Sequence, residues 1–116
     1  RYESGIDATT YFLGLSERPT AIFAATDEMA IGAIHCIQDS GLNVPEDVSV
    51  ISVDNSRISS MVRPLLTTVA QPMYDIGAVS MRLLTKLMKK ETVENAKVTL
   101  PHELIVRRSV SGPKGK

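Results

Sequence analysis

Apolar and polar positions along the chain follow helical and extended periods in turn. Helical spacing predicts a helix over about residues 4–16, which ends before Pro19 because proline disfavours helical backbone in the residue before it. A short buried strand over 20–25 and a helix over about 27–40 come next, and Gly41 supplies a left-handed stop. Further along, the pattern predicts strands over 48–53 and 67–70, a helix over 73–90, and extended segments over 97–100 and 102–108.

This alternation indicates an α/β fold class, a three-layer sandwich with a mainly parallel sheet covered by helices on both faces. Ligands of such sheets bind beyond the carboxyl ends of the strands. Thr26 and Asp54 stand at two such ends, and Thr26 or Asp27 can also cap the following helix. The Asp54 carboxylate is suited to accept hydrogen bonds from ligand hydroxyls, or else it starts an Asx turn.

Composition narrows the class of protein. The 116 residues are 43% hydrophobic and 22% charged with zero formal net charge, which suits a compact unit without a general field for nucleic acid or membranes. Cys36 is the single cysteine and lies in an apolar helical pattern, so we expect no intrachain disulfide and a cytoplasmic location. The chain lacks an initiator methionine and begins within an amphipathic pattern, which suggests a fragment.

Residues with catalytic or metal-binding chemistry are sparse. His35 and His102 have no second ligand at metal spacing, and no nucleophile motif or Gly-rich phosphate loop is present. We therefore expect no enzymatic activity, no metal and no cofactor.

The predicted helix over 73–90 has two distinct stripes. Ile76, Val79, Leu83 and Leu87 recur at helical spacing and are expected to face the sheet. Arg82, Lys86 and Lys90 form a second stripe, which Tyr74 begins. A row of one sign does not stabilise its own helix, so it is either a solvated face or a surface for an anionic partner such as a phosphoserine.

The predicted helix over 27–40 is apolar around most of its circumference and therefore needs two covers. One cover is the sheet. The other is either a partner subunit or a deeper burial in the same domain.

Three stretches, "PTAIFAATDEMAIGA", "GLNVPEDVSVISVDN" and "RPLLTTVAQPMYDIGAVSMRLL", follow one another in this order. Together they resemble the C-terminal part of the effector-binding domain of LacI/GalR-type bacterial transcription regulators. The resemblance implies an incomplete periplasmic-binding-protein-like fold of type I. It places residues 1–69 and 103–110 in the C-terminal lobe and 70–102 in the N-terminal lobe, with 111–116 as a flexible tail.

Residues 43–86 are most similar to the branch of this family that governs carbon catabolite control. That branch responds to phosphoserine HPr as corepressor and to sugar phosphates as secondary effectors. The resemblance implies an effector, a sugar or sugar phosphate, at Asp54 and Thr26. It also implies a homodimer, operator DNA bound only through an N-terminal helix-turn-helix outside these residues, and no membrane contact. The implied HPr-docking residues are Tyr74, Asp75, Arg82, Leu83 and Lys86, and the implied dimer interface comprises Met29, Ala33, Cys36, Met61 and Val62.

Two positions depart from the resembling branch. Glu103 stands where a second basic residue often helps to receive the partner, and Arg107 or Arg108 could restore that contact. Ser52 and Val53 replace the Gly and aromatic residue often found before the aspartate, so the wall beside Asp54 is smaller. The alternatives are a periplasmic-type sugar-binding protein, a LacI-family repressor of a specific sugar operon, and a small enzyme of flavodoxin-like architecture.

Overall fold

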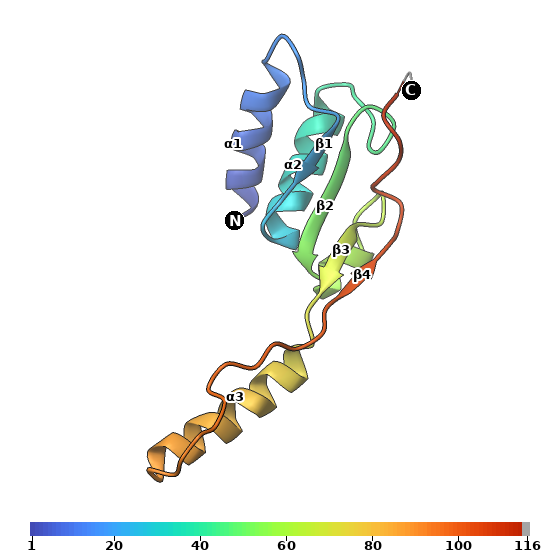
Figure 1. Ribbon diagram of the computed structural model, residues 1–116. Helices are drawn as coiled ribbons and strands as arrows, with labels where there is room; N and C mark the ends of the chain where they lie inside the picture. The colour runs from blue at the N-terminus through green and yellow to red at the C-terminus, as the bar shows by residue number, and fades with distance from the viewer. Residues whose placement is uncertain (115–116) are drawn as a thin grey trace. The chain divides into compact units, whose positions relative to one another are not determined.

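The computed structural model describes residues 1–114 (Figure 1). They form two compact units: the sheet unit, residues 1–70 with 104–114, and the α3 unit, residues 71–103. Assignment of these units to the lobes of a larger domain stays a prediction. The elements in chain order are α1 (Tyr2–Leu13), β1 (Ala21–Phe23), α2 (Asp27–Asp39), β2 (Ser49–Asp54), the 3-10 helix η1 (Arg57–Ser60), β3 (Thr67–Ala70), α3 (Met73–Met88) and β4 (Glu103–Ile105).

The four strands form one sheet in the order β1-β2-β3-β4 (Figure 1). β1 and β3 both pair with β2 in parallel, with Ile22 opposite Val50 and Ile51 opposite Thr67. The predicted α/β class with a mainly parallel sheet is thus confirmed. Because parallel strands end at one edge, the residues that follow β1, β2 and β3 lie at the same edge of the sheet.

The core of the sheet unit lies between α2 and one face of the sheet. Val50 and Ser52 of β2 are 0% exposed on this face, whereas Phe23 of β1, opposite Ile51, is 66% exposed. Within residues 1–114 the sheet unit therefore has a helical layer on one face of the sheet only. The buried apolar cluster comprises Ala24, Ala30, Ile34, Ile37, Val44, Val48, Val50 and Leu66.

Helix α1 packs against α2 with the two backbones in close contact (Figure 1). A Cβ atom on Gly5 would lie 2.0 Å from the carbonyl oxygen of Met29, and one on Gly32 would lie 2.2 Å from that of Tyr2. α1 is thus the second cover that the apolar circumference of α2 requires. Ala33, expected at a subunit interface, is 1% exposed and already buried within this chain.

Local capping signals predicted the ends of several elements well. Thr26 caps α2 and Gly41 has a φ of +84°, as expected, and β3 covers the predicted residues. Two expectations are wrong. Residues 97–100 form no strand, and α3 ends at Met88, so Lys90 lies beyond the helix and does not continue its basic stripe.

The last described segment is attached to the sheet unit rather than frayed. Ser109 is 0% exposed; its hydroxyl donates to the Val50 carbonyl and accepts from the Thr67 amide at 2.9 Å. The Ser111 amide donates to Ser49 Oγ at 3.0 Å, and Lys114 pairs with Asp47 at 3.1 Å. Residues 115–116 of the predicted tail lie outside the described residues.

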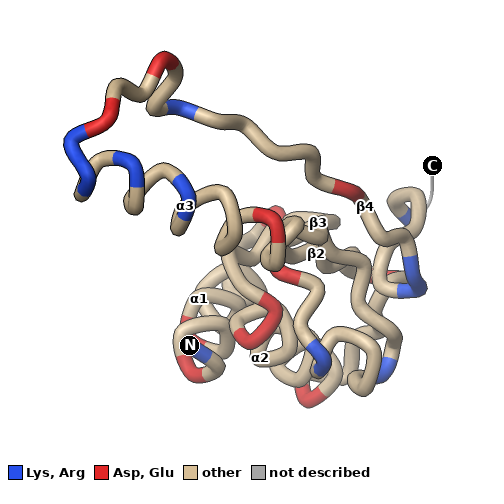
Figure 2. Tube along the Cα trace, turned by 90° about the horizontal axis from the view of Figure 1, so that it is seen from below, with Lys and Arg blue, Asp and Glu red and all other residues tan. Residues whose placement is uncertain are grey.

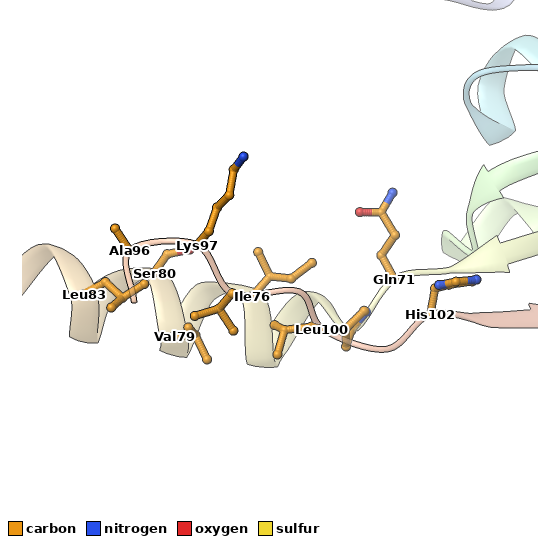
Figure 3. A pocket seen from close by; sticks show the side chains of 11 residues that line it. Gln71, Ile76, Val79, Ser80, Leu83, Ala96, Lys97, Leu100 and His102 are labelled. Carbon is orange, nitrogen blue, oxygen red and sulfur yellow. The ribbon is translucent and has the colours of Figure 1, made fainter. Parts of the chain in front are cut away.

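The α3 unit consists of α3 and the segment that returns after it. None of the 16 residues of α3 is buried. Ile76, Val79 and Leu83 line an open groove of about 510 Å³ together with Val98 and Leu100 of the returning segment (Figure 3). None of the helices within residues 1–114 has the length and apolarity needed to span a membrane.

Candidate functional site

The turn that follows β2 has an unusual backbone. Asp54 has a φ of +132° and Asn55 a φ of +56°, values that L-residues rarely adopt and that cost on the order of 1–3 kcal/mol each. The Asp54 side chain is exposed, and no group among residues 1–114 hydrogen-bonds to it, so the alternative of an Asx turn at Asp54 is not formed. The strained turn therefore presents a free carboxylate at the ligand-binding edge of the sheet.

Asp27 lies buried beneath this turn, with 1% of its surface exposed. Its Oδ1 accepts from Ser52 Oγ at 2.5 Å and from Thr68 Oγ1 at 2.8 Å. Its Oδ2 accepts from the amide of Ser56 at 2.6 Å and from the Ser56 hydroxyl at 2.7 Å. Burial alone would raise the pKa of Asp27, but the hydrogen bonds from Ser52, Ser56 and Thr68 together hold that pKa below its ordinary value of 3.8.

A second anchor holds the same turn from the C-terminal segment. The Arg107 guanidinium donates to Asn55 Oδ1 at 2.7 Å, to Ser59 Oγ at 2.9 Å and to the Leu66 carbonyl at 2.8 Å. These bonds commit Arg107 to the sheet unit, so it does not replace the basic residue missing at position 103. Of the two alternatives for that contact, Arg108 remains.

Thr26 stands at the end of β1, at the same edge as Asp54. Its Oγ1 accepts from the Met29 amide at 3.2 Å as the cap of α2, and the side chain is half-buried. Among the described residues its hydroxyl hydrogen has no acceptor, so it can still be donated to a ligand.

The residues expected to dock a phosphoprotein lie together on α3. Tyr74 is 87% exposed, and Asp75, Arg82 and Lys86 are exposed as well. Basic positions recur along the second half of the helix (Figure 2). Leu83 is half-buried and lines the groove of the α3 unit, so it is less accessible than the other four.

The residues expected at a dimer interface differ in exposure. Met61 is 63% exposed, whereas Met29 and Val62 are partly buried against the core. Cys36 is half-buried, with Sγ 3.4 Å from Thr10 Oγ1. Ala33 offers no surface, as described above.

Charged groups elsewhere do not gather into a metal site within residues 1–114, where no cluster of three His, Cys, Asp or Glu side chains is suitably placed. His35 instead hydrogen-bonds through Nδ1 to the Tyr2 hydroxyl at 2.7 Å.

A parallel α/β sheet with polar residues at its carboxyl edge defines the class of periplasmic-binding-protein-like domains. The family model described as "Periplasmic binding protein-like domain" matches residues 3–110, and the chain belongs to this family. The α/β, periplasmic-binding-protein-like fold class expected from the sequence is thereby confirmed.

Particular relatives fall within one group of regulators. The chain is 61% identical over 108 residues to catabolite control protein A of Priestia megaterium, covering 93% of this chain and 32% of that protein. It is 51% identical over 106 residues to catabolite control protein A of Staphylococcus epidermidis, covering 91% of this chain and 32% of that protein. The chain thus spans about a third of the length of these relatives, and the resemblance to LacI/GalR-type regulators is confirmed.

Solved structures agree. The transcription regulator CcpA of Lactococcus lactis superposes with a TM-score of 0.87 at 44% identity, covering 95% of this chain and 40% of that one. A dimeric Lac repressor with a C-terminal deletion superposes with a TM-score of 0.86 at 34% identity, covering 97% of this chain and 41% of that one.

Proposed function

We propose that this chain is the corepressor-binding and effector-binding part of a LacI/GalR-family transcription regulator of carbon catabolite control. The observation that carries the proposal is the 61% identity over 108 residues to catabolite control protein A of Priestia megaterium. Such a regulator is cytoplasmic and is not an enzyme. It binds operator DNA through a helix-turn-helix that lies outside these residues.

Phosphoserine HPr is the proposed corepressor, and α3 is its docking surface. A phosphoserine carries nearly two negative charges and three acceptor oxygens, which the planar fork of Arg82 can hold through paired hydrogen bonds. Lys86, one turn further along the same helix, adds a point charge. Tyr74 is 87% exposed and offers an aromatic anchor, while Asp75 beside it can accept a donor from the partner.

A sugar or sugar phosphate is the proposed effector, bound at the carboxyl edge of the sheet. The free Asp54 carboxylate would accept from two neighbouring hydroxyls, and the Thr26 hydroxyl would donate to the same ligand. Val53, half-buried, makes the adjacent wall smaller than an aromatic residue would, which favours a ligand without a large apolar face.

Dimerisation would connect these sites to DNA. The relatives include a dimeric Lac repressor, and on this chain Met61 with Val62, Met29 and Cys36 would contribute to an equivalent interface. Docking of the corepressor on one subunit would then bias the pair of DNA-binding segments. Such couplings are typically about 1–3 kcal/mol.

Calorimetry of the full-length protein with phosphoserine HPr tests the proposal. Replacing Arg82→Ala should weaken the affinity at least tenfold, because the bidentate partner of the phosphate is removed. Lys97→Ala is the matched control: it removes one exposed positive charge from the α3 unit but lies outside α3, and it should change the affinity less than twofold. Equal effects of the two variants, or no effect of Arg82→Ala, would overturn docking on this helix.

A further inference from the structure

Both backbone amides that follow Asp54 are held by one buried system of polar groups. The Ser56 amide donates directly to Asp27 Oδ2 at 2.6 Å. The Asn55 amide donates to Thr68 Oγ1 at 3.2 Å. These are the peptide groups on the C-terminal side of the residue with the φ of +132°, so they help to keep the strained turn in place.

The hydrogen-bond directions in this system depend on a carboxylate at residue 27. The Thr68 hydroxyl has one hydrogen, and it points to Asp27 Oδ1 at 2.8 Å, which leaves its lone pairs for the Asn55 amide. Ser52 Oγ donates to the same Oδ1. Asp27 therefore acts on both amides of the turn, on Ser56 directly and on Asn55 through Thr68.

We propose that Asp27 is a positioning residue of the effector site, which holds the turn so that the Asp54 carboxylate faces the ligand. Asp27 is buried and does not touch the ligand; it acts through Thr68 and the backbone of residues 55 and 56. The inference rests on the proposed function only in taking Asp54 as the effector contact.

A neutral amide cannot replace the carboxylate here. In Asp27→Asn one oxygen becomes an NH2 group, a donor with no acceptor role. If the NH2 group took the place of Oδ2, it would face the Ser56 amide and hydroxyl, and if it took the place of Oδ1, it would face the hydroxyls of Ser52 and Thr68. In either arrangement at least one amide of the turn loses its support.

Hydrogen–deuterium exchange of the full-length protein tests the positioning without any ligand. In Asp27→Asn, and in Thr68→Val, which keeps the carboxylate and the side-chain shape, the peptide covering residues 54–60 should exchange at least tenfold faster than in the parent. Peptides from α2 should be unchanged in Thr68→Val. Ser40→Ala is the control, since its hydroxyl bonds only to the carbonyl of Cys36 in its own helix, and it should leave the turn unchanged. If Asp27→Asn does not fold, Thr68→Val decides, and unchanged exchange of the turn overturns the proposal.

A double-mutant cycle with glucose 6-phosphate as the probe tests whether Asp27 acts through Asp54. Thr68→Val should lower the affinity about tenfold in the parent but less than twofold when Asp54→Asn is already present. Equal losses in both backgrounds would assign Thr68 and Asp27 a general structural role and overturn the proposal. If the parent binds no glucose 6-phosphate, this sugar-phosphate part of the proposed function fails, while the exchange experiment still decides whether Asp27 holds the turn.

Discussion

The guanidinium of Arg107 donates to Asn55 Oδ1 at 2.7 Å although the two residues are 52 positions apart in the sequence. Further bonds from the same side chain to Ser59 and to the Leu66 carbonyl join the C-terminal segment to the turn after β2. Replacing Arg107→Met keeps most of the side chain's length but leaves these acceptors without a donor. We expect the free energy of unfolding to fall by about 2–3 kcal/mol, measured by urea denaturation of the full-length protein.

Arg108→Met is the control for that change, because Arg108 is exposed and should alter stability by about 0.5 kcal/mol or less. Equal losses at positions 107 and 108 would mean that general charge, and not these hydrogen bonds, accounts for the effect.

The contact of α1 with α2 makes a second prediction. Gly5→Ala places a Cβ 2.0 Å from the Met29 carbonyl oxygen, so the helices must separate, and we expect a loss of about 2–3 kcal/mol in the free energy of unfolding. Gly14→Ala, where the nearest atom would lie at an ordinary 3.5 Å, should leave stability unchanged or slightly raised. Thermal denaturation of both variants measures the difference, and a stable Gly5→Ala protein would contradict the close approach.

Asp27 gives the pH dependence a definite sign. Its pKa is lowered in the folded protein, so its contribution to stability is present above the ordinary value of 3.8 and is lost as the pH falls through the lower, folded value. Asp27→Asn should therefore be less stable than the parent at pH 7, and the gap between the two proteins should shrink below about pH 4. Urea midpoints measured from pH 7 to pH 3 test this, and a gap that widens in acid would contradict it.

Met61 is the most exposed of the residues expected at a dimer interface, with 63% of its surface accessible. Met61→Glu would bury a charge on dimerisation, so the full-length dimer should dissociate at micromolar concentration. Sedimentation velocity measures the change. Met88→Glu, 74% exposed at the end of α3, is the matched control and should remain dimeric.

Glu103 places a negative charge where the resembling branch often has a basic one. Glu103→Lys should raise the affinity for phosphoserine HPr severalfold at low salt, and the gain should shrink at high salt because exposed charges are screened. Glu94→Lys makes the same charge change elsewhere in the α3 unit. If both variants raise the affinity equally, a general field and not a local contact is responsible.

Much of the fold follows from local patterns. The cap at Thr26, the positive φ of Gly41 and the whole of β3 were predictable because each depends on a few neighbouring residues. The segment over 97–100 was not, since its apolar residues pack beside α3 without a strand to pair with.

The candidate site was less predictable, because its organisation depends on contacts across the sheet. Asp27 reads in the sequence as a favourable charge at the start of a helix, yet it is buried beneath Ser56 and accepts from β2 and β3. Ser52 reads as a change in the wall beside Asp54, yet its hydroxyl donates to Asp27. A run of small polar residues at the strand ends, "SVDNS" followed by "TT", is the signal that could have indicated this arrangement.

The lack of buried residues in α3 affects how a partner would bind it. A helix of 16 residues is marginally stable in water without tertiary packing, so its folded state is supported mainly by the groups that cover it. A partner that contacts Tyr74 and Arg82 together selects the helical form and must offset part of its ordering entropy. For this chain alone, the measured affinity should therefore increase with any change that raises the helicity of α3.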